Sequence, residues 1–69
     1  MNQEKFEKLY SPKRNRIEKL IPYLQEKPRP IYAMSRFLEV DKVTIRNYIN
    51  TLRDLGVDLK QDDLKKYYI

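Results

Sequence analysis

The stretch EVDKVTIRNYINTLRDLG, residues 39–56, decides the fold because it contains a helix start, an amphipathic pattern and a helix stop in unbroken order. Asp41 can accept hydrogen bonds from the free N–H groups of the next turn, so we expect the helix to begin there. Gly56 favours a left-handed C-terminal cap and ends it. Between them an apolar stripe at i, i+3, i+4 and i+7 predicts a face buried in a core: Ile45, Tyr48, Ile49 and Leu52.

The opposite side of this helix, over about residues 42–55, suggests a function. Arg and Asn carry donor and acceptor pairs that match the edges of guanine and adenine, and a helix of this size can lie in a DNA major groove. The alternative is an ordinary solvated surface. The side chains that we expect to face the bases are Lys42, Val43, Thr44, Arg46, Asn47 and Asn50.

The composition limits the chain to one small domain and points to a polyanionic partner. The 69 residues are 41% hydrophobic, which allows a single modest core. Fifteen Lys and Arg against ten Asp and Glu give a net charge of +5, which favours nucleic acid or an anionic membrane surface. No apolar run approaches the roughly 18 to 20 residues that span a bilayer, and the polar N-terminal residues are unlike a signal peptide. We therefore expect a cytoplasmic protein.

The chain has no cysteine and no histidine. This removes disulfides, thiolate chemistry, the usual zinc ligands and the most common general base. The adjacent Asp62 and Asp63 fall in an expected turn, where carboxylates are usually solvated. We therefore expect no enzyme activity, metal, cofactor or small-molecule ligand.

Two helices are expected before the deciding stretch. Residues 2–10 carry Phe6, Leu9 and Tyr10 at helical spacing, and so short a helix either packs on the body of the domain or makes a dimer contact. Ser11 as N-cap and Pro12 at the first position begin the next helix. Its inward stripe is Ile17, Leu20, Ile21 and Leu24.

Two features of this second helix bear on its shape and its charge. Pro22 predicts a kink, or an early end near Ile21. Three cations at the helix start oppose the helix dipole, and either a phosphate backbone or water relieves that cost. These cations are Lys13, Arg14 and Arg16.

The KPRP segment, residues 27–30, is an extended connector, and Pro30 opens a third helix. Met34 and Phe37 of this helix are expected in the core. Glu39 stands in the turn to the next helix where a glycine is common, so a mildly strained conformation is expected there. After Gly56 the period changes to that of two short strands, with an acidic turn at residues 61–63. The expected strands contain Val57 and Leu59, then Leu64, Tyr67 and Ile69.

A family pattern runs through the second half of the chain as Met34-Ser35, Arg36-Phe37, Leu38-Glu39-Val40-Asp41, Lys42-Val43, Thr44-Ile45, Ile49-Asn50-Thr51-Leu52, Gly56 and Lys66-Tyr67-Tyr68-Ile69. In this order the chain resembles the winged helix-turn-helix domain, most closely the version at the N-terminus of biotin-repressor and DeoR-like bacterial regulators. Glu39, Asp41 and Lys66 depart from the glycine, serine and glycine of that pattern. The fold expected is mainly α with a small β-hairpin: a three-helix winged helix-turn-helix over residues 12–69, preceded by an arm or short helix in residues 1–11.

The resemblance implies that the helix over residues 42–55 reads double-stranded DNA and that the protein is a small transcriptional regulator. Phosphates would repel Asp62 and Asp63, so we do not expect the hairpin tip to enter the minor groove. Free-standing domains of this size are common in phage and plasmid genomes. Contacts with the DNA backbone are assigned to Arg29, Tyr32, Arg36, Lys60, Lys65 and Lys66.

Two other functions compete with DNA reading. Acidic residues near the proposed DNA face and numerous tyrosines suggest a protein-binding winged helix, such as an antirepressor or an assembly factor. Stacking of tyrosines on single-stranded nucleic acid ranks last, because Tyr67 and Tyr68 point to opposite faces of a strand. The DNA-reading hypothesis also expects a dimer on a repeated DNA site, with Phe6, Leu9 and Tyr10 as the candidate homodimer contact.

Overall fold

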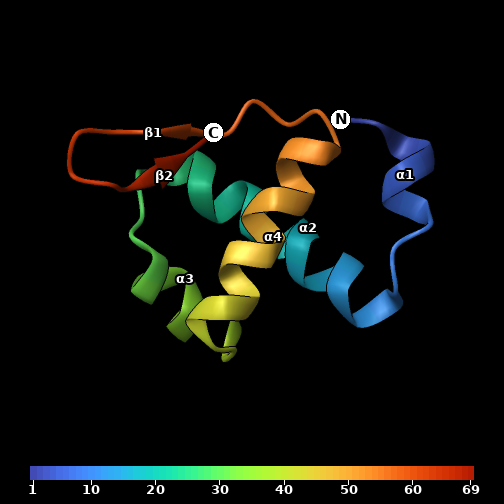
Figure 1. The fold of residues 1–69 in the computed structure, drawn as a ribbon, viewed down its shortest axis with the longest axis horizontal. Coiled ribbons are helices and arrows are strands. Elements are labelled where there is room, and N and C mark those ends of the chain that lie inside the picture. Colours follow the sequence, from blue (N-terminus) through green and yellow to red (C-terminus); the bar gives the residue numbers. More distant parts are fainter.

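The computed structural model describes residues 1–69 and contains four helices and one hairpin. The helices are α1 (Gln3–Glu7), α2 (Ser11–Glu26), α3 (Ile31–Leu38) and α4 (Lys42–Asp54), and the antiparallel strands are β1 (Lys60–Gln61) and β2 (Tyr67–Tyr68). The expectation of a mainly helical fold with a small hairpin is therefore confirmed. In Figure 1, α4 crosses α2 at the centre, α1 lies at one end, and α3 and the hairpin lie at the other. None of the helices has the length and apolar character needed to cross a membrane.

The start, buried face and stop of α4 agree with the sequence. An Asp41 carboxylate oxygen accepts a hydrogen bond from the Thr44 N–H at 2.7 Å. At the other end Gly56 has φ +82°, and the Val57 N–H donates to the Leu52 carbonyl at 3.0 Å, which closes the helix. All four stripe residues are buried: Ile45, Tyr48, Ile49 and Leu52.

The rest of the core comes mainly from α2. The expected early end of α2 near Ile21 is wrong, because the helix continues through the exposed Pro22 to Glu26. Leu24, two residues beyond the proline, is fully buried, and this burial offsets the lost backbone hydrogen bond. The Ser11 N-cap is also wrong: the N-cap position is Tyr10, without a side-chain cap, and the Ser11 hydroxyl accepts from Arg14. The core outside α4 consists of Ile17, Leu20, Leu24, Met34, Leu55 and Leu59.

The turn between α3 and α4 holds the strained residue that the sequence predicts. Glu39 adopts a left-handed conformation, with φ 56° and ψ 45°. The Val40 N–H donates to the Ser35 carbonyl at 3.1 Å, and the Ser35 hydroxyl donates back to the Val40 carbonyl. This pair of hydrogen bonds keeps Glu39 in a backbone region that side chains with a Cβ disfavour.

The expectation that Phe37 lies in the core is wrong. Its side chain is 46% exposed, whereas Met34 is fully buried. Phe37 lies on the flank of α3 that faces α2, where it stacks on Tyr23 with ring centroids 4.0 Å apart. A partner on α2 therefore shelters one face of Phe37 and leaves the other open.

The hairpin is shifted relative to the predicted strands. Lys60 pairs with Tyr68 and Gln61 with Tyr67, whereas Val57 and Leu59 precede the first strand. Leu64 was expected in a strand but lies in the turn and is 73% exposed. An Asp62 carboxylate oxygen accepts from the Leu64 and Lys66 N–H groups, and these bonds extend the turn to Lys66.

The N-terminal segment packs on the body of the domain, which is one of its two expected outcomes. Phe6 and Leu9 are half-buried against the core, and the Asn2 N–H donates to the Leu55 carbonyl at 2.6 Å. Tyr10 remains 76% exposed. The segment is therefore tied to the end of α4.

The left-handed Glu39 generates a stability prediction. We expect Glu39→Gly to raise the free energy of unfolding by up to about 1 kcal/mol, because glycine adopts this conformation without a Cβ penalty. The same exchange at Glu18, within α2, should lower it by about 1 kcal/mol. Urea unfolding followed by circular dichroism measures both, and a destabilised Glu39→Gly variant would contradict the strain.

Candidate nucleic-acid interface

The outward face of α4 is open to solvent. Arg46 and Asn47 are both exposed, and neither the hairpin nor the N-terminal segment covers them. Their side chains make no hydrogen bond or ion pair within the chain. Val43, one turn earlier, is 62% exposed although it is apolar. The structure thus brings together five of the six base-facing candidates as one exposed group: Lys42, Val43, Arg46, Asn47 and Asn50.

Thr44, the sixth candidate, belongs to the cap. Hydrogen bonds from the Thr44 hydroxyl and from its backbone N–H lower the pKa of Asp41 below the ordinary aspartate value. Thr44 is half-buried. Thr44 therefore takes part in starting the helix and is the least accessible residue of the six.

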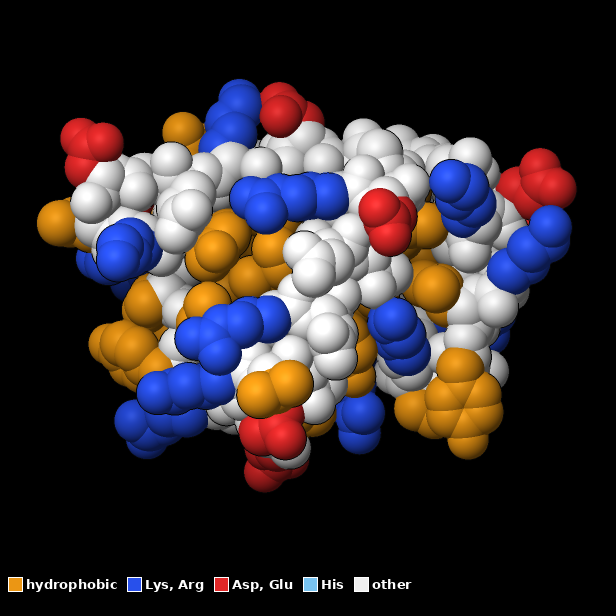
Figure 2. Space-filling view, viewed as in Figure 1, with side chains coloured by type: hydrophobic (Ala, Val, Ile, Leu, Met, Phe, Trp, Pro, Cys, Tyr) orange, Lys and Arg blue, Asp and Glu red, His pale blue; other side chains and the backbone are white.

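Basic side chains continue from α4 onto α3. Figure 2 shows Lys and Arg gathered over α3 and the first part of α4, on the same face of the molecule. Arg36 is exposed and its side chain makes no hydrogen bond or ion pair, and Tyr32 is 57% exposed. These two backbone candidates are therefore open to solvent on α3, the helix that precedes α4.

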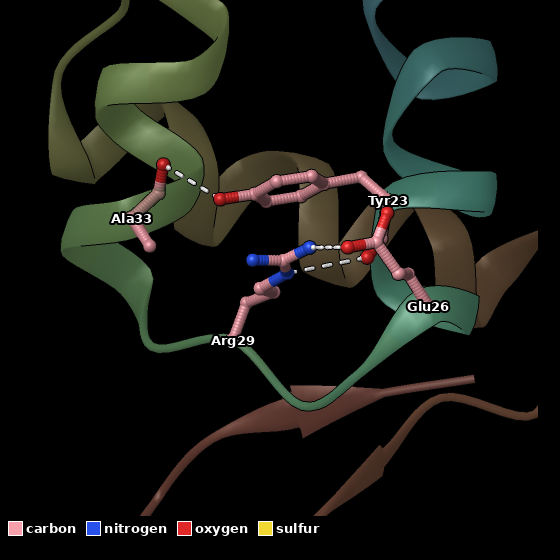
Figure 3. A network of polar contacts seen from close by, with 4 residues as sticks. All are labelled: Tyr23, Glu26, Arg29 and Ala33. Carbon is pink, nitrogen blue, oxygen red and sulfur yellow. Dashed lines mark hydrogen bonds and ion pairs between the residues drawn. The ribbon is translucent and has the colours of Figure 1, made fainter.

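Arg29 is held inside the fold. Its side chain is 14% exposed and forms an ion pair of 2.9 Å with Glu26. Its Nε donates to the Tyr23 carbonyl at 3.4 Å, and the guanidinium lies 4.0 Å from the centroid of the Tyr23 ring. Figure 3 shows this cluster, with the Tyr23 hydroxyl directed at the Ala33 carbonyl. With its guanidinium bound in this way, we leave Arg29 out of the proposed DNA contacts.

The remaining cations lie in two separate places. In the hairpin, Lys60 pairs with Asp58 at 3.4 Å, Lys65 is exposed and Lys66 is half-buried. At the start of α2, Arg14 donates to the Glu7 carbonyl and Arg16 to the Tyr48 hydroxyl, while Lys13 is half-buried. Figure 1 places the start of α2 beside α1, at the end of the molecule opposite the hairpin. The structure therefore does not gather the backbone candidates into one patch.

Sequence reasoning missed the stacked column of Arg29, Tyr23 and Phe37. No local signal marks it, because its members are 6 and 14 residues from Tyr23 and come from a connector and two helices. The column also receives the hairpin: the Arg29 N–H donates to the Tyr67 carbonyl at 2.8 Å, and the Tyr67 N–H donates back at 2.7 Å. These two backbone hydrogen bonds hold the hairpin against the connector between α2 and α3.

Comparisons of the chain with protein-family models, with curated proteins and with solved structures found no match. What the exposed group on α4 can bind is therefore inferred from its geometry and chemistry.

The lowered pKa of Asp41 predicts a pH-dependent contribution to stability. Because the folded-state pKa lies below the unfolded one, the contribution is present above about pH 3.9 and is lost as the pH falls through the lowered folded-state pKa. We expect Asp41→Ala to lower the melting temperature at pH 7 and to differ much less from the parent at pH 2. Asp63→Ala is the control, because the Asp63 carboxylate caps no helix, and it should leave the melting temperature unchanged at pH 7. An Asp41→Ala deficit of equal size at both pH values would contradict the cap.

Proposed function

We propose that this protein is a sequence-specific double-stranded DNA-binding protein of the winged helix-turn-helix type, acting as a small transcriptional regulator. The observation that carries the proposal is the exposed Arg46 and Asn47 on α4. Both lie on a helix whose opposite face is buried in the core. A rigid helix therefore presents amide and guanidinium groups that nothing in the chain satisfies.

The dimensions of α4 suit a major groove. Its 13 residues give a rod about 20 Å long, and an α-helix with its side chains is about 10–12 Å across, which matches a groove about 12 Å wide. Three residues, Glu39 to Asp41, join α3 to α4, as in a helix-turn-helix. In this arrangement α3 lies across the backbone and its exposed Arg36 and Tyr32 reach phosphates.

Each exposed side chain on α4 has a distinct role in this proposal. The Arg46 guanidinium pairs with two acceptors of a guanine, and Asn47 with the donor and acceptor of an adenine. Asn50, one turn further along, takes a second base or a phosphate. The apolar Val43 contacts a thymine methyl group, and Lys42 at the start of the helix neutralises a phosphate.

Substitutions on α4 test the proposal after bound sequences have been selected from a random duplex pool at stated salt. We expect Arg46→Ala and Asn47→Ala each to weaken binding to the selected site by about 1–3 kcal/mol, with relaxed preference at one base pair. Asn15→Ala and Lys19→Ala on the exposed face of α2 are matched controls that should bind as the parent does. Parental binding by both α4 variants would remove α4 as the reading helix.

The salt dependence of the same complex tests the backbone contacts. If about five phosphates are neutralised, log affinity should fall against log salt with a slope near −4.5. Arg36→Ala should reduce the magnitude of that slope by about 1 without changing the preferred sequence. An unchanged slope would take Arg36 out of the interface.

A protein-binding role is the second candidate, and the hairpin favours it. The exposed Leu64 stands beside Asp63 in a turn that phosphates would repel. Absence of sequence enrichment from the duplex pool, together with specific capture of a protein that Leu64→Ser releases, would favour this role over DNA reading.

A further inference from the structure

A shallow groove runs between the second half of α2 and the outer face of α3. Its floor is the stacked pair of Tyr23 and Phe37, whose rings are almost parallel. The Arg29 guanidinium lies 4.0 Å from the centroid of the Tyr23 ring and is largely enclosed, whereas Phe37 at the other end of the column stays partly exposed. The residues lining the groove are Tyr23, Tyr32, Ala33, Arg36 and Phe37.

The groove combines an apolar surface with a single unpaired cation. Phe37 is 46% exposed and Tyr32 57%, although both are large and apolar over most of their surface. Arg36 is the only charged residue in the lining and has no acidic partner. The chemistry that fits here is an apolar side chain next to a carboxylate.

The hairpin turn presents that combination. Leu64 is 73% exposed, and the adjacent Asp63 is exposed without a hydrogen bond or ion pair. The turn is held by two hydrogen bonds to the Asp62 carboxylate, of 2.9 and 2.8 Å, and by the Lys65 N–H donating to the Asp62 carbonyl at 3.0 Å. Leu64 and Asp63 are therefore presented on a pre-formed loop, which lowers the entropy cost of docking.

Groove and turn occupy the same end of the molecule. Figure 1 shows the hairpin loop in the upper part and α3 in the lower part of the end opposite α1, and Figure 2 shows separate apolar side chains over each. Both are exposed to solvent, so the turn does not fill the groove of its own copy. A twofold rotation that sets two such ends against each other places each turn at the groove of the other copy, which is a self-complementary contact.

We propose that this end of the protein is a self-association surface for a second copy of the chain. Leu64 of each copy docks against Phe37 and Tyr32 of the other, and Asp63 pairs with Arg36. The contact excludes the N-terminal Tyr10, which lies on α2's other end, and leaves the exposed face of α4 open. Because the two docked loops are short, the interface falls below the roughly 1,200 Å² of a standard complex, and the dimer is weak and concentration-dependent.

Sedimentation equilibrium of the full chain over a range of concentrations, without DNA, tests the surface. We expect Leu64→Ser to raise the dimer dissociation constant at least about tenfold, because two buried leucine contacts are lost per dimer. Tyr10→Ser removes an apolar side chain of 76% exposure at the opposite end and should leave the constant unchanged. A parent chain that stays monomeric to about 1 mM overturns the proposal, as does an equal effect of the two variants.

Charge reversal gives a sharper test of self-association. Because Arg36 is also a proposed DNA contact, the measurement is made without DNA, which keeps the two proposals separate. Asp63→Lys and Arg36→Glu should each abolish self-association, because like charges then meet at both contacts of the dimer. An equimolar mixture of the two variants should dimerise as the parent does, since both contacts regain opposite charges. Circular dichroism confirms that each variant is folded. A mixture that remains monomeric overturns the proposal, whereas the proposed base contacts of Arg46 and Asn47 do not depend on its outcome.

Discussion

Burial of the apolar stripe of α4 is the constraint on which the rest of the structure depends. Ile45 and Leu52 have no exposed surface, and they pack with Ile17, Leu20 and Met34 into a core of ten buried residues. With no cysteine in the chain, no disulfide adds to this core. A helix can bury only one face here, so fixing the stripe inward also fixes Arg46 and Asn47 outward. Burial of the same stripe therefore sets both the stability of the domain and the orientation of its candidate binding face.

The column of Arg29, Tyr23 and Phe37 holds the hairpin in position, as the buried stripe holds α4. A two-stranded hairpin is not stable alone. Here the connector supplies a further backbone pairing, between Arg29 and Tyr67, and the Ile69 N–H donates to the Leu24 carbonyl at 3.2 Å. The guanidinium of Arg29 joins the same connector to α2 through Glu26. One basic residue, which charge alone would assign to DNA, is therefore structural.

The two proposed surfaces share Arg36 and Tyr32 but otherwise differ in chemistry. The face of α4 offers hydrogen-bonding groups and cations, which suit base edges and phosphates. The end formed by α3 and the hairpin turn offers aromatic rings, a leucine and one charge of each sign, which suit another protein surface. Joining two copies through that end would carry two open α4 faces in one particle, so weak binding to each half of a DNA site would be reinforced by effective concentration. The same contact covers Arg36 and Tyr32, so self-association competes with their proposed contacts to phosphates.

The sequence by itself determined the elements whose hydrogen bonds and periodicity are local. The Asp41 cap, the stripe of α4, the stop at Gly56 and the strained Glu39 all depend on groups within seven residues of one another, so short windows contain their cause. Tertiary structure decided the rest: α2 continues past Pro22, Phe37 is half-exposed, Arg29 is enclosed, and the strands begin three residues later than Val57. Each of these depends on a partner supplied by another element, or on side-chain bonds within the turn that compete with strand pairing. Spacing along the chain carries no measure of such contacts, because they form only once the core has brought the elements together.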